Sequence, residues 1–266
     1  MINWLMRMLK TPKTQIGFLL TLIFITAFIN NPSLKVLVVF LLSLVSTVFF
    51  DVLFLRLRKI KWFFPSASLV TGSIIGLLTS PDLSWYAPVA VGIIAMFAKN
   101  FIRFSNRHIF NPAGFGLFVS AIIFKQSISW WAVSFQQFSI FHFPSSIYFL
   151  VLLSPAFVSI FKMKRYRITF SFLIAYILIN KILNSQFIIH NSFLDPTILF
   201  FSIVMLPEPM TSPNNHKRQI FFGIFVALLS IIVSSPILNS KFLILNSLDP
   251  LVLSLLLGNL VFFKLR

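Results

Sequence analysis

Apolar segments follow one another along almost the whole chain and are separated only by short polar or basic connectors. No polar stretch is long enough to build a separate water-soluble domain. Hydrophobic residues make up 58% of the 266 residues, above the roughly 45–50% that is usual for soluble domains. Because an apolar helix of about 17–25 residues can cross a bilayer, the sequence predicts an all-α integral membrane protein.

Measured against this length, the apolar segments give ten predicted transmembrane helices, several of them short. They are residues 16–29, 34–55, 64–79, 83–98, 111–124, 145–161, 168–183, 194–206, 220–233 and 242–263. The whole chain, 1–266, is then a single membrane domain with two halves, 1–125 and 144–266. The outer connector between the halves is rich in aromatic residues, so we expect it to lie along the membrane interface or to dip into it.

The basic residues agree with this count, because cytoplasmic connectors of membrane proteins carry an excess of Lys and Arg. With a cytoplasmic N-terminus, all 22 lysines and arginines fall in inward segments except Lys35, Lys125, Lys181 and Lys241. This distribution explains the net charge of +17 as an orientation signal and argues against nucleic-acid binding. The N-terminal segment lacks a small-residue cleavage site, so we expect a retained basic tail, with both termini cytoplasmic.

Proline-containing breaks recur in the two halves. In the first half, Ser80-Pro81-Asp82 separates two predicted helices and Asn111-Pro112 opens the next. In the second half, the segment LPEPMTSP (206–213) follows one predicted helix and Asp249-Pro250 opens the last. Since five helices per half is an odd number, the two halves must insert with opposite orientation, which predicts an inverted repeat. The alternative is that these prolines simply mark the ends of helices.

Carboxylates are the main candidates for chemistry, because a carboxylate in or near the bilayer is costly to keep there. The acidic residues are Asp51, Asp82, Asp195, Glu208 and Asp249. For Asp51, pairing with Arg56 or Arg58 is a structural alternative, and Asp249 before Pro250 has the pattern of a helix cap. We favour a structural role for Asp82 and Asp195 and weigh a functional role equally with a structural one for Glu208 and Asp249.

Other classes of site find little support in the sequence. The absence of cysteine excludes disulfides, thiolate-ligated iron–sulfur clusters and Cys-based zinc sites within this chain. The four histidines lie far apart and show no ligand-like spacing, so we expect no metal site. No nucleotide-binding, nucleophile-elbow or zincin motif occurs, and we assign no catalytic residue.

Several of these segments resemble one family. The pair TGSIIGLLTSPDLSWYAPVAVG and FNPAGFGLF resembles a motif of RnfD, a membrane component of the Rnf electron-transport complex. The related NqrB component of the sodium-translocating NADH:quinone oxidoreductase (Nqr) shares it. In the second half, MLPEPMTSPNNHKRQIFFGIFVALL resembles that family's second break, and LDPLVLSLLLGNL its last helix, with Asn259 ten positions after the acid. FFDVLFLRLRK matches the end of its second helix. The resemblance covers residues 34–124 and 194–263.

The resemblance implies a ten-helix subunit of a flavin-using, redox-driven pump for Na⁺ or H⁺ in the plasma (inner) membrane, with other membrane subunits as partners. It also implies a site for ions at the helix breaks. We expect this site to comprise Asp82, Asn111, Glu208, Thr211, Ser212, Asp249 and Asn259.

Two departures from the family pattern concern this site and the cofactor. Glu208 stands where relatives usually have Asp. Relatives also carry a Ser-Gly-Ala-Thr motif whose Thr bears FMN, whereas this chain has no glycine between Gly116 and Gly223. We therefore expect no covalent FMN, and leave a non-covalent flavin, FMN or riboflavin, open.

Three functions are consistent with these observations. The first is a subunit of an Rnf- or Nqr-like translocase, either flavin-binding or without a redox group of its own. The second is a stand-alone channel or transporter for a small solute with the same inverted architecture. The third is a scaffold that only anchors partner subunits, which leaves the acidic breaks unexplained. A bound flavin or co-purifying redox subunits would favour the first function, and solute flux by the chain alone would favour the second.

Overall fold

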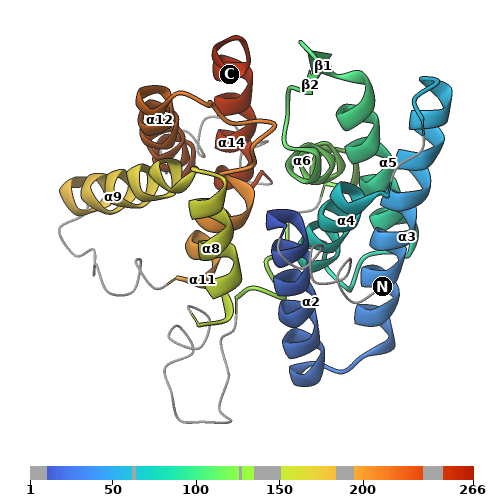
Figure 1. Ribbon diagram of the computed structural model, residues 1–266. Coiled ribbons are helices and arrows are strands. Elements are labelled where there is room, and N and C mark those ends of the chain that lie inside the picture. The colour runs from blue at the N-terminus through green and yellow to red at the C-terminus, as the bar shows by residue number, and fades with distance from the viewer. Residues whose placement is uncertain (1–10, 62–63, 126–127, 135–150, 184–194, 236–247) are drawn as a thin grey trace.

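The computed structural model describes residues 11–61, 64–125, 128–134, 151–183, 195–235 and 248–266. These residues contain ten α-helices and one short hairpin, in which β1 (Arg103–Phe104) pairs antiparallel with β2 (Arg107–His108). In Figure 1, α2 to α6 lie on the right and α8 to α14 on the left. The helical fold class is therefore confirmed.

Each of the first five predicted segments contains one helix. These are α2 (Pro12–Asn30), α3 (Leu34–Leu57), α4 (Ser66–Leu78), α5 (Tyr86–Phe101) and α6 (Pro112–Phe124). Side-chain caps begin three of them: the Thr11, Ser33 and Asn111 side chains each accept a hydrogen bond from a backbone N–H in the first turn. Pro112 occupies the first turn of α6, where its missing N–H costs nothing.

The second five predicted segments also contain helices. These are α8 (Ser154–Lys162), α9 (Tyr166–Leu183), α11 (Pro196–Phe200), α12 (His216–Ser234) and α14 (Pro250–Phe262). The helix α11 continues as a π-helical turn, η1 (Phe201–Met205), and α14 ends in a 3₁₀ turn, η3 (Phe263–Leu265). Asp195, Asn215 and Asp249 cap α11, α12 and α14. The first parts of the predicted segments 145–161 and 242–263, and most of the outer connector, lie outside the described residues.

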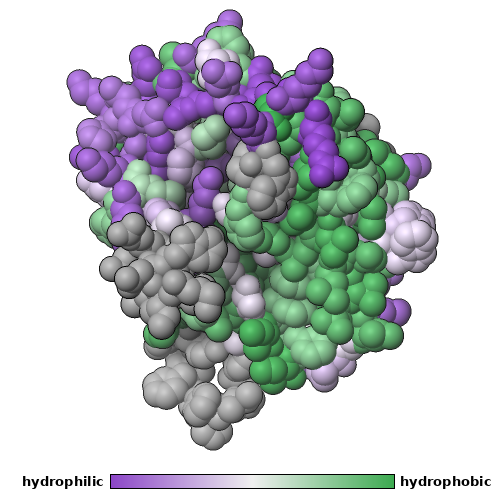
Figure 2. Space-filling view, turned by 45° about the vertical axis from the view of Figure 1, so that its right-hand side comes forward, coloured by the Kyte–Doolittle hydropathy of each residue, from purple (hydrophilic) through white to green (hydrophobic). Residues whose placement is uncertain are grey.

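Four helices, α2, α3, α9 and α12, are long and apolar enough to cross a membrane, and most of the others are shorter apolar helices. The long helices do not share one direction: α2 and α3 run from top to bottom in Figure 1, whereas α9 runs across the view. Figure 2 shows hydrophilic side chains gathered toward one end of the visible face and apolar side chains over most of the rest of it. The long apolar helices and the apolar surface are those of a membrane protein, and the count of ten membrane-crossing helices stays a prediction.

Glycines allow two pairs of helices to approach closely. In α5, Gly92 faces Ser46 of α3, and a Cβ at this glycine would lie 3.1 Å from the Ser46 Cβ. In α12, Gly223 faces α9, where a Cβ would contact the Ser171 hydroxyl and lie 2.6 Å from the Ile168 carbonyl oxygen. Small residues are enriched at such contacts because apolar lipid offers helices little hydrophobic reason to associate, so close packing must hold them together.

Candidate functional site

A cavity of about 220 Å³ lies between the two groups of helices. Its wall is largely apolar and comes from α2, α4, α5, the end of α8 and the chain that follows η1. The polar residues that line it are Lys13, Thr71, Lys99, His108, Asn111 and Glu208. The cavity therefore adjoins both the start of α6 and the second-half break, which the sequence places 97 positions apart.

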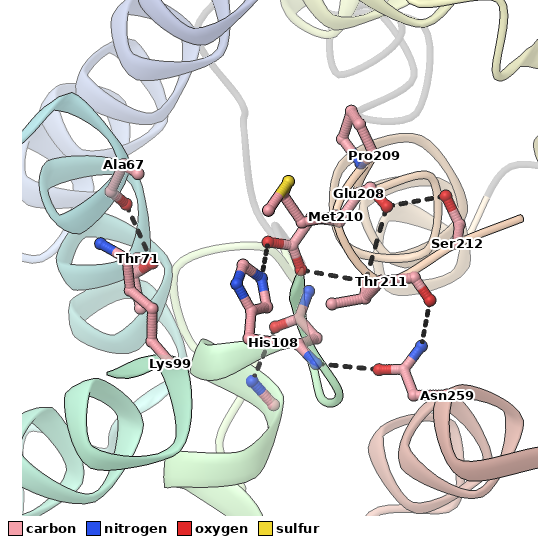
Figure 3. A network of polar contacts seen from close by, with 12 residues as sticks. Ala67, Thr71, Lys99, His108, Glu208, Pro209, Met210, Thr211, Ser212 and Asn259 are labelled. Carbon is pink, nitrogen blue, oxygen red and sulfur yellow. Dashed lines mark hydrogen bonds and ion pairs between the residues drawn. The ribbon is translucent and has the colours of Figure 1, made fainter. Parts of the chain in front are cut away.

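Glu208 is the carboxylate at this cavity. Its Oε1 lies 3.0 Å from Nε2 of His108, whose side chain is only 7% exposed. Its Oε2 accepts a hydrogen bond from the Thr211 hydroxyl at 3.1 Å, and the Ser212 hydroxyl donates to the Glu208 carbonyl at 2.7 Å. Figure 3 shows the imidazole of His108 pointing toward Glu208, with the Lys99 side chain on the opposite side of the view. The carboxylate is thus held by both the first-half hairpin and its own turn.

Asn111 and Asn259 join the start of α6 to the break. The backbone N–H of Asn111 donates to Oδ1 of Asn259 at 2.8 Å, and Nδ2 of Asn259 donates to the Thr211 carbonyl at 3.1 Å. The Asn111 side chain caps α6 through Gly114 N–H and donates to the Met205 carbonyl at 3.2 Å. Because both asparagines are buried, these bonds satisfy backbone groups that the interrupted helices leave open.

Five of the seven predicted site residues therefore converge. We call them the break cluster: Asn111, Glu208, Thr211, Ser212 and Asn259.

Asp249 and Asp82 are not part of the break cluster. Oδ1 of Asp249 caps α14 by accepting from Val252 N–H at 2.9 Å, and its Oδ2 accepts from the indole N–H of Trp130 at 2.6 Å. Asp82 lies beside a different cavity of about 480 Å³, which the neighbouring Trp131 also lines. The predicted site is thus divided into the break cluster and two separate carboxylates.

Two arginines hold the chain around the break. Arg165 is 5% exposed and donates to the Pro213 carbonyl and to the Asn214 side chain. Arg266 donates to the carbonyls of His108 at 2.9 Å and Asn259 at 2.9 Å. Burial lowers the pKa of each guanidinium to about 10, so both stay protonated at neutral pH. Both were expected only as orientation charges, and no sequence signal distinguishes them from the other connector arginines.

A second buried network surrounds Asp51. Its carboxylate is fully buried, lies 2.8 Å from Nζ of Lys99, and accepts from Ser68 at 2.5 Å and from Asn100 at 2.9 Å. The structural alternative for Asp51, pairing with Arg56 or Arg58, is therefore wrong. At 3.6 residues per turn, a residue five positions along lies about 140° around the helix, whereas α4 and α5 pack directly against α3.

Arg58 instead donates to Asn100 at 3.3 Å. The true partner, Lys99, directly follows the fourth predicted segment, where it was expected only as an inward charge.

The groups at the cavity can bind ligands through oxygen atoms and through charge. In the described ranges, no three His, Asp or Glu side chains lie close enough to hold a metal ion. The break cluster offers one carboxylate, backbone carbonyls, amides and hydroxyls, which are oxygen-rich groups of the kind that hard cations prefer. The Lys99 charge is balanced by Asp51, and Glu208 is paired with His108.

Comparison with known protein families agrees with the motifs. The model of the NQR2, RnfD, RnfE family matches residues 6–142, slightly more than half of the chain. The matched range includes the first-half break and the start of α6, so the resemblance to RnfD and NqrB is confirmed. A search of curated proteins found no match. The chain belongs to the NQR2, RnfD, RnfE family.

Proposed function

We propose that this chain is a membrane subunit of an Rnf- or Nqr-type complex and helps couple electron transfer to Na⁺ or H⁺ movement across the plasma membrane. Its family consists of subunits of multi-subunit complexes, so other membrane subunits are its expected partners and carry the redox chain. The observation that carries the proposal is the break cluster, in which the opened helix of one half meets the break of the other beside a cavity.

Matched packing supports an inverted repeat of two five-helix halves. In the first half α5 packs on both α3 and α6, and in the second half α12 packs on both α9 and α14. A glycine in α5 meets a serine of α3, and a glycine in α12 meets a serine of α9. The pairs α2 with α8 and α6 with α14 also contact each other, as equivalent helices near a two-fold axis do. Ten spans with both termini inside would place the two halves in opposite orientations, as an inverted repeat does.

The contacts at the proline breaks also support an inverted repeat. Asn111 opens α6 and bonds to the second-half break through Met205 and Asn259. Asp249 opens α14 and bonds to Trp130, and the adjacent Trp131 donates to the Gly76 carbonyl, close to the first-half break. We infer that a cation crosses between these two regions, with Glu208 near the cytoplasmic side and Asp249 near the outer side.

Charge-neutral substitutions test this path. We expect Glu208→Gln and Asp249→Asn to leave insertion intact and to reduce cation transport strongly in the assembled complex, because a neutral amide loses most of the attraction to a desolvated cation. Asp82→Asn should have a milder effect. The measurement is Na⁺ uptake or acidification in vesicles, with electron transfer recorded in parallel.

The controls separate ion binding from capping. Asn caps a helix about as well as Asp, so Asp249→Asn keeps the cap of α14. Asp195→Asn, at the cap of α11 and away from the break cluster, should transport normally. Unchanged transport in both Glu208→Gln and Asp249→Asn would remove the proposed path. Solute flux through the purified chain alone would favour the alternative function, a stand-alone channel or transporter.

We further propose that the chain carries no covalent flavin, since the glycine-dependent attachment motif of its relatives is missing between Gly116 and Gly223. The denatured protein should show no flavin fluorescence in a gel. Absorbance of the native, detergent-purified protein would reveal a non-covalent FMN or riboflavin. A fluorescent denatured band, with a modified Thr or Ser located by peptide mass mapping, would contradict the proposal.

A further inference from the structure

An apolar groove runs along the outside of the molecule between α9 and α12. Its volume is about 640 Å³, and almost its entire lining is apolar. Ile174 and Leu178 form one wall and are 58% and 56% exposed, while Ile224 and Leu228 line the other wall. Ala175 lies on the α9 side and leaves space in the groove. In a membrane, such a groove is filled by lipid or by another helix.

One end of the groove carries a positive charge without an acidic partner. Arg167 lines this end, with its guanidinium 5.3 Å from the centre of the Tyr166 ring. The ion pairs found in the described part of the chain are Lys99–Asp51 and His108–Glu208, so neither carboxylate balances Arg167. Its buried Nη1 also has no hydrogen-bond partner there. A bound anion would balance this charge.

The groove extends along α9 from Arg167 to Leu178. This is eleven residues, or about 16 Å at 1.5 Å per residue. Both helices begin at the charged end, α9 at Tyr166 and α12 at His216. Tyrosine and arginine beside each other at the start of an apolar stretch are typical of the headgroup level.

We propose that the α9–α12 groove binds one phospholipid with an anionic headgroup. The headgroup lies at Arg167, and an acyl chain lies between the Ile174–Leu178 and Ile224–Leu228 walls. A lipid is favoured over a partner helix because the groove combines an unbalanced cation at one end with an almost entirely apolar lining along the rest of its length. Its placement in the cytoplasmic leaflet rests on the proposed topology, whereas the binding itself does not.

Native mass spectrometry of the detergent-purified full chain tests the site. The probes are phosphatidylglycerol and phosphatidylcholine with the same acyl chains, titrated separately. We expect phosphatidylglycerol to bind more tightly, and Arg167→Gln to weaken that binding roughly fivefold, the effect of one basic residue at an anionic lipid surface. Ala175→Phe, which fills the groove and keeps the charge, should weaken the binding of both lipids.

Arg56→Gln is the matched control, since Arg56 is exposed on α3 in another inward segment, and it should bind as wild type does. Equal binding of the two lipids by the wild-type chain would overturn the proposal even if a variant failed to fold. So would an equal loss in Arg56→Gln and Arg167→Gln, which would indicate general attraction to basic residues. Cross-linking of Leu178→Cys to another subunit in the complex would assign the groove to a partner helix instead. None of these results depends on ion transport.

Discussion

Glu208 and Asp249, the two acids in the second-half breaks, have different surroundings. The Glu208 side chain is 25% exposed, adjoins a cavity and faces His108, so its carboxylate can be reached by a small cation. Asp249 caps α14 and accepts from Trp130, which together give it a sufficient structural role. Of the two acids, Glu208 is therefore the better candidate for a cation ligand.

The Asp51–Lys99 pair gives a prediction on stability. Asp51→Asn leaves the Lys99 ammonium, 13% exposed, without its counter-charge. Removing one partner of a buried ion pair typically destabilises a protein by about 3–5 kcal/mol. We therefore expect a clearly lower thermal unfolding midpoint for Asp51→Asn in detergent, measured by circular dichroism.

A double variant shows whether charge is the cause. Asp51→Asn combined with Lys99→Met removes both charges and should recover most of the lost stability, because the unbalanced ammonium is gone. Asp82→Asn, at an exposed carboxylate, should melt as the wild type does. A double variant no more stable than Asp51→Asn would show that the hydrogen bonds of Asp51 to Ser68 and Asn100 matter more than its charge.

At the scale of helices, the contact between α9 and α12 depends on Gly223. A Cβ there would meet the Ile168 carbonyl oxygen at 2.6 Å, and a backbone atom cannot move aside as a flexible side chain can. We expect Gly223→Ala to separate the two helices and to destabilise the fold by about 1–3 kcal/mol, the usual cost of overpacking. The readout is the thermal unfolding midpoint in detergent.

Gly17→Ala is the control, since the nearest side-chain atom would lie 4.0 Å from its Cβ and Ala favours a helix over Gly. It should melt at or slightly above the wild-type temperature. Ser171→Ala should not rescue Gly223→Ala, because the Ile168 carbonyl remains in place. Equal midpoints for Gly223→Ala and Gly17→Ala would mean that α9 and α12 adjust without cost.

At the scale of the whole molecule, the proposed topology places the end of α8 inside and the α2–α3 connection outside. The chain has no cysteine, so single cysteines report their own side. Lys35→Cys should react with an impermeant thiol reagent added outside intact cells, and Lys162→Cys should react only after the membrane is opened; both positions are exposed. Arg165 is a poor probe because it is buried against the break.

Labelling of Lys162→Cys from outside would contradict the ten-helix topology. The reason for expecting the reverse is the charge distribution, in which Lys162, Lys164, Arg165 and Arg167 form one inward segment.

The sequence by itself determined the helical membrane class, the family and the position of every proline break. These follow from local properties: apolar length, a capping residue before proline, and the placement of basic connectors. Asn111 and Asp249 were foreseeable as helix starts because a cap and a proline act on the first turn alone.

Only the tertiary structure decided which breaks meet. The bond from Asn111 to Asn259 spans 148 positions and that from Trp130 to Asp249 spans 119, and no local pattern encodes either. The same holds for Lys99, which finds Asp51 because α5 packs on α3, and for Arg165 and Arg266, whose guanidiniums are buried against backbone carbonyls. Such partners depend on how helices pack, and packing is a property of the whole fold, which the order of residues along one helix does not reveal.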